Sequence, residues 1–411
     1  MKINSARLKD RIYSLAEIGK IGETGVRRLA HSQEDRKAVD LVKEWMEDAG
    51  LDAHIDCFGN LRGRIEGTEK EKPILMLGSH IDSQPYGGRF DGTAGALGAI
   101  EVIHSFQDHG FTPVRTIEVV CFSDEEGARF NKGVFGVRAL IGQLEEGELE
   151  RKDKEGMTRL EALKEFGVTP EITQSPVYQP GDIEAFLELH IEQGPVLEDL
   201  KKPIGIVSAI SGPLWLTVSI EGFAGHAGSV PMNLRQDALV GASTIIREFN
   251  DLVNNEGTSN TVGTVGSLQT FPNSRNIIPE KVEFTIDLRD IDMEVRDRLE
   301  TRLYEIIKKT CSALNLKYSL SEDTRSDPRY CADWIKTIMK EEDEKLGYSS
   351  PTLMSGPFHD ALFMSYISDY GMIFVRCEKG ISHNPLEFAE MKDIEKGVEL
   401  LYQTAARLSE S

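Results

Sequence analysis

The chain has 411 residues, 40% of them hydrophobic and 28% charged, so it is long enough for two domains with separate cores. Acidic residues outnumber basic residues by 68 to 47, giving a formal net charge of -21, which argues against nucleic acid and anionic membrane surfaces as partners. No apolar run reaches the length of a membrane helix, and no signal-peptide pattern opens the chain, so a cytoplasmic location is expected.

In the first part of the chain, segments with helical and strand periodicity alternate. A helix is expected to begin after Ser32 and to end at Gly50, followed by a strand over residues 51–57. A second helix is expected over residues 93–106. Continuous apolar runs are typical of strands covered on both faces, and they occur at residues 73–77, 116–122, 185–189 and 372–375. This alternation predicts an α/β fold with a mixed sheet flanked by helices.

The middle of the chain has a different order of elements. We expect strands at residues 214–222, 261–270, 281–289 and 317–320, and helices at residues 235–254 and 293–314. The order strand, helix, strand, strand, helix, strand is that of a ferredoxin-like unit. The sequence therefore predicts an inserted domain over residues 211–325, within a first domain formed by residues 1–210 and 326–411.

The five cysteines are odd in number and widely separated, and none forms a C-x-x-C pair. This pattern argues against a disulfide framework and against a thiolate zinc site.

Histidines and acidic residues follow four of the buried strands. Because ligands of open α/β sheets bind at the carboxyl ends of the strands, we expect these side chains to converge at one edge. One further acidic residue, Asp91, lies in a glycine-rich loop just before the helix at residues 93–106. The residues that follow strands are His80 with Asp82, the run Asp124-Glu125-Glu126, His190, and His383.

Each of these residues has an ordinary explanation when it is considered alone, as a structural histidine or a solvated acidic turn. Together they bring three imidazoles and at least two carboxylates to one predicted edge, in a chain with nine histidines. We therefore interpret them as one cluster. Four other histidines do not follow a buried strand, and we interpret them as surface or structural residues: His31, His54, His104 and His109.

A mixed set of imidazoles and carboxylates suits Zn²⁺, Mn²⁺, Co²⁺ or Ni²⁺ better than Mg²⁺ or Ca²⁺. Five ligands exceed the number that one open catalytic zinc site uses, so a pair of metal ions with a bridging carboxylate is expected. Of the neighbours Glu125 and Glu126, one can bind metal while the other transfers the proton. Asp82 is placed to orient the ring of His80.

The motifs around these residues resemble the amidohydrolase branch of the zinc-peptidase superfamily. This branch includes N-carbamoyl-L-amino-acid hydrolases, allantoate amidohydrolases, ureidoglycolate hydrolases and β-ureidopropionases. The resemblance covers nearly the whole chain and keeps the order of the motifs. The matching segments are residues 78–83, 87–92, 124–130, 190–195 and 381–383.

The resemblance implies roles for the clustered residues. His80 and His190 would bind one metal ion, Glu126 and His383 the other, and Asp91 would bridge the two. Glu125 would act as the general base and acid, and Asp82 would orient His80. The inserted domain would act as a lid and as the interface of a homodimer.

Three further segments of the inserted domain resemble the family: residues 225–228, 273–279 and 287–289. The resemblance implies that His226 holds the substrate and stabilises the oxyanion. It also implies that Asn276 and Arg289 grip the substrate carboxylate. Gln193, which follows the His190 motif, resembles a further substrate contact.

The chain departs from the family at Phe358, in Gly356-Pro357-Phe358-His359-Asp360-Ala361, where the family often has Gly-Ala-Gly-His-Asp-Ala. A bulky residue there is expected to reshape or occlude the pocket. Ser229-Val230-Pro231-Met232 replaces the Thr-Thr-Pro-Met that is commoner in the family. Val230 with residues 234–237, and residues 375–377, resemble the allantoate and ureidoglycolate members more than the carbamoylases.

The sequence thus predicts a two-metal hydrolase of linear amide or ureido C–N bonds in small substrates that carry a carboxylate. N-carbamoyl-L-amino acids and allantoate are the leading substrates. A dipeptidase or N-acyl-amino-acid deacylase with the same centre is the close alternative. A metal-binding protein without catalysis belongs to a different class, and Glu125 beside Glu126 argues against it, because a binding protein has no need of a base.

Overall fold

The computed structural model describes residues 2–170 and 176–410, and the chain divides into two compact units. The first unit comprises the chain up to Ser208 and again from Cys331 onward; the second spans Ala209–Tyr330. The insertion predicted at residues 211–325 lies inside the second unit. The chain leaves the first unit along β8 (Ile204–Ile210) and returns to it along β16 (Arg329–Tyr330). These two strands pair antiparallel.

The main sheet of the first unit is mixed, with the strand order β8-β18-β7-β5-β6-β4-β3. The four central strands, β18, β7, β5 and β6, are parallel to one another, whereas β8, β4 and β3 pair antiparallel with their neighbours. The mixed α/β fold expected from the sequence is confirmed. The strands are β3 (Asp52–Ile55), β4 (Leu61–Ile65), β5 (Ile74–His80), β6 (Ile117–Phe122), β7 (Ile183–Ile191), β17 (Thr352–Ser355), which pairs with β8, and β18 (Asp369–Val375).

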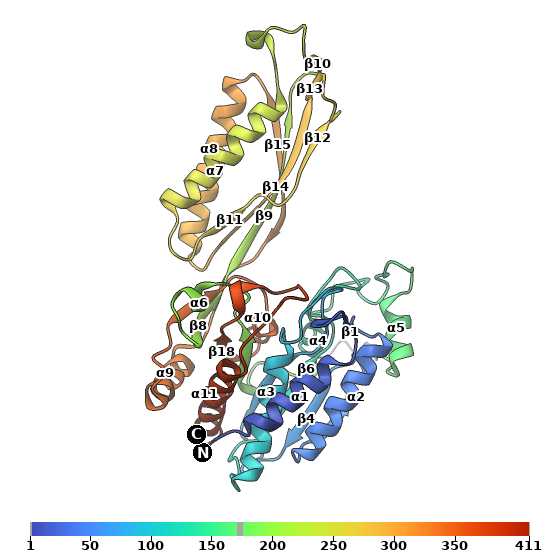
Figure 1. Ribbon diagram of the computed structural model, residues 1–411, viewed down its shortest axis with the longest axis vertical. Helices are drawn as coiled ribbons and strands as arrows, with labels where there is room; N and C mark the ends of the chain where they lie inside the picture. Colours follow the sequence, from blue (N-terminus) through green and yellow to red (C-terminus); the bar gives the residue numbers. More distant parts are fainter. Residues whose placement is uncertain (1, 171–175, 411) are drawn as a thin grey trace. The chain divides into compact units, whose positions relative to one another are not determined.

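One face of this sheet packs on the long helices α1 (Ser5–Ala16), α2 (Gln33–Asp48), α3 (Thr93–Asp108) and α11 (Met391–Glu410). Figure 1 shows α1, α2 and α3 side by side over the sheet. Alternate strand residues, such as Leu187 and Leu189, enter this core, as the two-residue period of a strand requires. Helix α3 lies so close to β7 that a Cβ on Gly95 would come within 1.9 Å of the Leu189 carbonyl oxygen.

The intervening strand residues point to the opposite face of the sheet, and this set includes His80, Glu188 and His190. The short helices α4 (Phe135–Leu140) and α10 (Asp360–Met364) contact the strands near these residues. The remaining elements of the first unit are β1 (Lys20–Ile21), β2 (Gly25–Val26), α5 (Arg159–Phe166), α6 (Val196–Asp199), α9 (Asp333–Leu346) and the 3-10 turn η2 (Glu378–Gly380).

The second unit is a five-stranded antiparallel sheet with two helices, in the order expected of a ferredoxin-like unit. Its elements are β9 (Gly212–Glu221), α7 (Ala238–Glu256), β11 (Val262–Thr264), β12 (Leu268–Phe271), β14 (Lys281–Asp290), α8 (Met293–Ala313) and β15 (Lys317–Arg325). A separate ribbon of β10 (Gly225–His226) and β13 (Ile277–Ile278), with the 3-10 turn η1 (Met232–Leu234), lies in the same unit.

Two strand predictions for this unit were wrong in detail. The strand expected over residues 261–270 is interrupted at residues 265–267, so β11 and β12 pair with β14 one after the other. The last strand, β15, extends to Arg325 rather than stopping at residue 320. It is an edge strand with mostly exposed side chains, and such a strand carries no alternation of apolar residues that would reveal its length.

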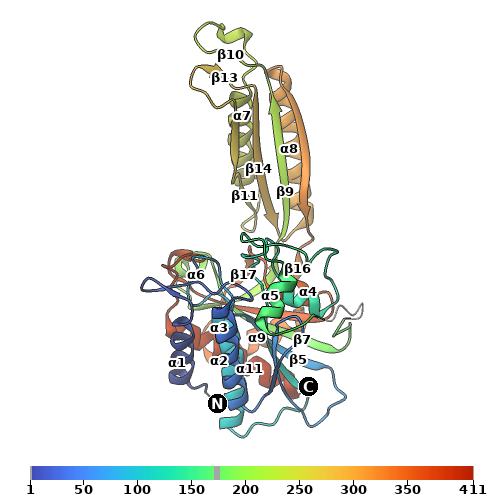
Figure 2. The ribbon, with the colours of Figure 1, turned by 90° about the vertical axis from the view of Figure 1, so that its right-hand side faces the viewer.

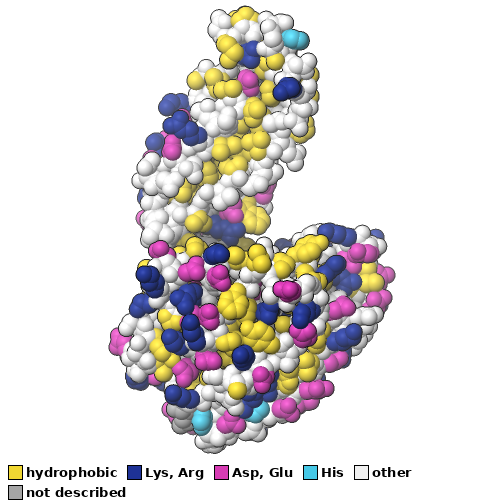
Figure 3. Space-filling model, in the orientation of Figure 1, with side chains coloured by type: hydrophobic (Ala, Val, Ile, Leu, Met, Phe, Trp, Pro, Cys, Tyr) yellow, Lys and Arg dark blue, Asp and Glu magenta, His cyan; other side chains and the backbone are white. Residues whose placement is uncertain are grey.

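Helices α7 and α8 cover one face of this sheet, as Figure 2 shows from the side of the strands. The opposite face is open, and it carries Trp215, Val262 and Phe271, all exposed, beside polar residues. Figure 3 shows hydrophobic patches on the visible side of this unit. Among the described helices of both units, none is long and apolar enough to cross a membrane.

Candidate metal centre

The carboxyl ends of the parallel strands bring the five predicted metal ligands together. His80 ends β5 and His190 is the second-last residue of β7, while Glu126 follows β6. Asp91 precedes α3, and His383 lies in the loop after β18. The five residues form two groups that share one carboxylate: His80, Asp91 and His190, and Asp91, Glu126 and His383. We call these the inner group and the outer group.

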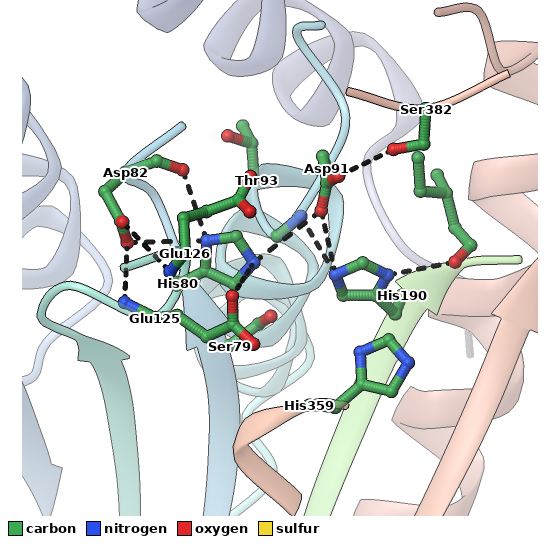
Figure 4. Close-up of polar contacts among 12 residues, drawn as sticks. Ser79, His80, Asp82, Asp91, Thr93, Glu125, Glu126, His190, His359 and Ser382 are labelled. Carbon is green, nitrogen blue, oxygen red and sulfur yellow. Dashed lines mark hydrogen bonds and ion pairs between the residues drawn. The ribbon is translucent and has the colours of Figure 1, made fainter. Parts of the chain in front are cut away.

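All three side chains of the inner group are buried. The Asp91 Oδ1 atom lies 3.1 Å from His190 Nε2 and 3.6 Å from His80 Nε2. Each ring is held through its other nitrogen: His190 Nδ1 is 2.9 Å from the Ile191 carbonyl oxygen, and His80 Nδ1 is 3.2 Å from that of Asp82. These contacts favour a hydrogen on Nδ1. Both Nε2 atoms face Asp91, as Figure 4 shows.

The outer group is built on the other oxygen of Asp91. His383 Nε2 lies 3.3 Å from Asp91 Oδ2 and 3.4 Å from Glu126 Oε2. The side chain of His383 is 48% exposed, whereas that of Glu126 is 5% exposed. His383 also has a left-handed backbone, with φ of 54°. Such a conformation is uncommon for a residue other than glycine and costs free energy, so surrounding contacts must hold it.

Gly92 allows the inner group to close. Its φ is 61°, and a Cβ there would lie 2.4 Å from His80 Nε2. Its backbone N–H also faces His190 Nε2, at 3.2 Å. Only glycine fits a position that is both left-handed and this close to an imidazole.

The turn Asp124-Glu125-Glu126 is anchored by the carboxylate of Asp82. The amide of Glu125 donates to Asp82 Oδ1 at 3.2 Å, and the amide of Glu126 donates to Asp82 Oδ2 at 3.3 Å. Asp82 Oδ1 also lies 3.5 Å from His80 Nδ1. The two glutamates then point to different groups: Glu125 Oε2 is 3.6 Å from His80 Nε2, and Glu126 Oε2 faces His383.

A buried ion pair lies beneath this turn. Arg159 Nη2 donates to Asp124 Oδ2 at 2.8 Å, and both side chains are fully buried. Asp124 has φ of 51°, so the residue before Glu125 is held in a conformation that few residues other than glycine adopt. The pair ties the turn to α5, which begins at Arg159.

Burial and crowding shift the pKa values of the clustered groups. Burial lowers the pKa of His80, but the carboxylates of Glu125, Asp82 and Asp91 outweigh it and raise the pKa well above its usual range. Burial also raises the pKa of Glu125 well above normal, partly offset by His80. Burial raises the pKa of Glu126 to about 7. The hydrogen bond to Asp91 raises the pKa of His383 to about 9.

These residues fit a pair of divalent cations. Ligand atoms at 2.0–2.2 Å from a tetrahedral ion are separated by about 3.3–3.6 Å. The contacts from Asp91 to the three histidines, and from His383 to Glu126, span 3.1–3.6 Å. Four carboxylates crowd three imidazoles here, and two divalent cations would balance that negative charge.

Gln193 lies beside the outer group. Its Nε2 donates to Asp91 Oδ2 at 2.9 Å and approaches His383 Nε2 at 3.3 Å. Its φ is 55°, which makes it another residue near the cluster with a left-handed backbone.

The other predicted contact residues belong to the second unit. His226 is exposed, and its Nδ1 accepts a hydrogen bond from the Gly228 amide at 3.1 Å. The carbonyl oxygen of Asn276 accepts from the amide of Ala227 at 2.9 Å, next to His226. Arg289 is on the open face of the sheet, where it forms a bidentate pair with Asp287 and lies over the ring of Trp215.

The structure adds two contacts of the cluster that the sequence analysis did not assign. Gln84 Nε2 donates to Glu126 Oε2 at 2.7 Å. The ring of His359, fully buried, packs edge-on against His190 with 4.4 Å between ring centroids, as Figure 4 shows. The position of His359 beside the departure at Phe358 was the available signal, whereas an isolated glutamine offers none. Phe358 itself is half-buried.

Comparison with known proteins adds a family to this geometry. Residues 76–407 match the peptidase family M20/M25/M40. The chain is 46% identical over 404 residues to an N-carbamoyl-L-amino-acid amidohydrolase from Pseudomonas sp. (strain NS671), covering 98% of each chain. It is 35% identical over 424 residues to an allantoate deiminase from Arabidopsis thaliana, covering 95% of this chain and 81% of the other.

A solved structure resembles the whole chain. The amidase of the hydantoinase/carbamoylase family from Burkholderia multivorans superposes with a TM-score of 0.93 at 35% identity, covering 99% of this chain and 98% of the other.

Proposed function

The chain belongs to the peptidase family M20/M25/M40, and we propose that it hydrolyses the carbamoyl C–N bond of N-carbamoyl-L-amino acids with two divalent metal ions. The chain is an amidohydrolase of carbamoyl or ureido C–N bonds, in line with relatives named N-carbamoyl-L-amino-acid amidohydrolase and allantoate deiminase. The observation that carries the two-metal part is the division of Asp91: one oxygen faces His80 and His190, and the other faces His383.

The similarity favours carbamoyl amino acids over allantoate. The carbamoylase relative is 46% identical, against 35% for the allantoate deiminase. The short segments that favoured the allantoate and ureidoglycolate members lie outside the metal cluster, and they weigh less than identity over the full chain.

Divalent cations at the two groups supply Lewis-acid polarisation of the carbonyl and acidify water. The inner cation would be held by His80 and His190, the outer one by Glu126 and His383, with Asp91 shared. Glu125 takes the proton from water and delivers it to the leaving nitrogen, since it points at the cluster and its raised pKa makes it a stronger proton acceptor. Asp82 would hold His80 and the turn that carries Glu125 in position relative to each other.

His226 would donate to the developing oxyanion. Its Nδ1 accepts from the Gly228 amide, so the hydrogen is carried by Nε2. A preorganised N–H donor of this kind stabilises charge that develops in the transition state. Gln193, Asn276 and Arg289 would contact the substrate, the last two through its carboxylate, which a guanidinium can bind through two hydrogen bonds.

We further propose that two copies of the chain complete each site, through a homodimer formed by the second unit as a lid. Within one copy, Arg289 and Lys281 lie at opposite ends of β14. Arg289 is opposite Pro213 of β9, and Lys281 is opposite Glu221. Eight residues of strand span about 27 Å. The ribbon of β10, which contains His226, and β13, which follows Asn276, lies beyond the end of β14 that begins at Lys281 (Figures 1 and 2). A small substrate cannot reach both ends, so His226 and Arg289 would come from different copies.

Subunit mixing tests this arrangement. Dimers mixed from inactive His226→Ala and Glu125→Gln chains should regain part of the activity, because one kind of site then combines an intact His226 with an intact Glu125. The control is each variant mixed with itself. No recovered turnover in verified mixed dimers contradicts the shared site.

A substrate panel tests the main proposal. The protein, stripped and reloaded with Mn²⁺, Zn²⁺ or Co²⁺, is given N-carbamoyl-L-amino acids, their D-enantiomers, allantoate, a dipeptide and an N-acetyl amino acid. The highest kcat/KM is expected for the N-carbamoyl-L-amino acids. A preference for allantoate would show that allantoate, rather than an N-carbamoyl-L-amino acid, is the substrate. A preference for the dipeptide or the N-acetyl amino acid would support the peptidase or deacylase alternative. Full turnover by metal-free protein would refute the metal centre.

A further inference from the structure

Glu387 is a buried carboxylate between the two loops that carry Asp91 and His383. Glu387 is only 1% exposed to solvent. Its Oε1 atom accepts hydrogen bonds from the amides of Phe90 at 2.9 Å and Asp91 at 3.1 Å. The carboxylate therefore fixes the backbone at the residue shared by the inner and outer groups.

The second oxygen of Glu387 reaches the outer group through Ser382. Ser382 Oγ lies 3.0 Å from Glu387 Oε2 and 2.7 Å from Asp91 Oδ2. That Asp91 oxygen is the one that faces His383, and Ser382 directly precedes His383 in the chain. One hydroxyl thus joins Glu387 to the outer half of Asp91.

The loop around Asp91 leaves space for Glu387. A Cβ on Gly88 would lie 2.2 Å from Glu387 Cδ and Oε1, so only glycine admits the carboxylate. A buried carboxylate is costly unless it is hydrogen-bonded. Within the described residues, two amides donate to Glu387, the Ser382 hydroxyl is shared between Glu387 and Asp91, and no Lys or Arg forms an ion pair with Glu387. Neutral side chains could link these two loops without the cost of burying a charge. A carboxylate at this place, beside Asp91, therefore suggests a role beyond linking the loops.

We propose that Glu387 is a positioning residue for the outer metal ion. It holds the Asp91 backbone and, through Ser382, aims Asp91 Oδ2 and the His383 loop at the same point. His383 is half-exposed and has a left-handed backbone, so few other contacts hold it. The inner histidines are anchored through their own Nδ1 atoms, so the inner group depends on Glu387 only through the backbone of Asp91. This inference rests on the two-metal function proposed above.

Titration of apo-protein with Co²⁺ tests the proposal by calorimetry and by the visible absorption of the bound ion. In Glu387→Ala the first equivalent should bind within about threefold of the wild-type affinity, while the second weakens about 10–100-fold, the usual effect of losing a partner of a metal ligand. Glu387→Gln should weaken the second equivalent less. Its oxygen still accepts from both amides, and its amide group donates to Ser382, which leaves the Ser382 hydroxyl for Asp91.

Ser382→Ala provides a variant with little risk to folding, and the second equivalent should again weaken selectively. Asp393→Ala is the matched control: Asp393 is equally buried and binds Arg376, away from the cluster. It should lower the Tm of the apo-protein without changing either Co²⁺ affinity.

The proposal is overturned if Glu387→Ala behaves like Asp393→Ala, with a lower Tm and two wild-type Co²⁺ affinities. It is equally overturned if both equivalents weaken alike. Neither result touches the two-metal function itself, which fails only if wild-type protein binds a single Co²⁺ or turns over without metal.

Discussion

The inner and outer groups share Asp91 but are held by different parts of the fold. The inner histidines lie on adjacent parallel strands, buried, with each ring fixed through Nδ1. The outer histidine lies on a loop, is 48% exposed and has a left-handed backbone. A ligand on a central strand is positioned by the core, whereas a ligand on a loop depends on a few polar contacts. The two proposed metal ions should therefore differ in affinity and in the substitutions that weaken their binding.

The largest effect is expected from removing one histidine of each group. His190→Ala should abolish activity and lower the bound amount of both metal ions, because the shared Asp91 loses its inner partner. His383→Ala should also abolish activity but leave close to one metal ion per chain. Elemental analysis after dialysis measures both. Equal losses in the two variants would erase the distinction between the groups.

The adjacent glutamates divide in the same way. Glu125→Gln should keep both metal ions while kcat falls by about 10²–10⁴, the usual share of a general base. Glu126→Gln should release the outer ion, since it replaces a metal-binding carboxylate. Metal content and kcat of the two variants decide this, and the reverse pattern would exchange their roles.

The affinity of the outer group for metal should depend on pH. Because the pKa of His383 is about 9, metal binding must displace a proton below that pH. The affinity of the weaker equivalent should thus rise about tenfold per pH unit between pH 7 and 9 and level off above. Below about pH 7 the slope should steepen, since burial raises the pKa of Glu126 to about 7. A flat profile, measured by Mn²⁺ titration in matched buffers, contradicts this.

The smallest effect is expected at Gln84, whose Nε2 orients Glu126. Gln84→Ala should weaken the outer ion about tenfold, at the lower end for a partner of a metal ligand. Ser79→Ala is the control on the other side of the comparison, since Ser79 donates to Glu188 beneath the inner group. It should leave the outer ion unchanged, and a loss there would show that the groups are coupled more widely.

Much of the fold could be predicted because the parallel strands are continuous apolar runs and the ligands follow their carboxyl ends. His80 and His190 lie at the ends of strands, so the sequence could place them at one edge of the sheet. Glu387 and Ser382 could not be found in this way, because their contacts with Asp91 join residues about three hundred positions apart and leave no local pattern. The break between β11 and β12, and the polar end of β15, lack the alternation on which strand prediction depends.

The pairing at the junction between the units has a consequence for how this protein can be altered. The amide of Cys331 donates to the carbonyl oxygen of Ser208 at 2.9 Å, so the two points at which the first unit is interrupted already lie together. Closing that gap with a tight turn costs little chain entropy, and every member of the inner and outer groups lies outside the excised stretch. The segment between Ser208 and Cys331 therefore contributes no member of the proposed metal centre, and we expect the first unit to keep its metal binding when a short turn replaces that segment.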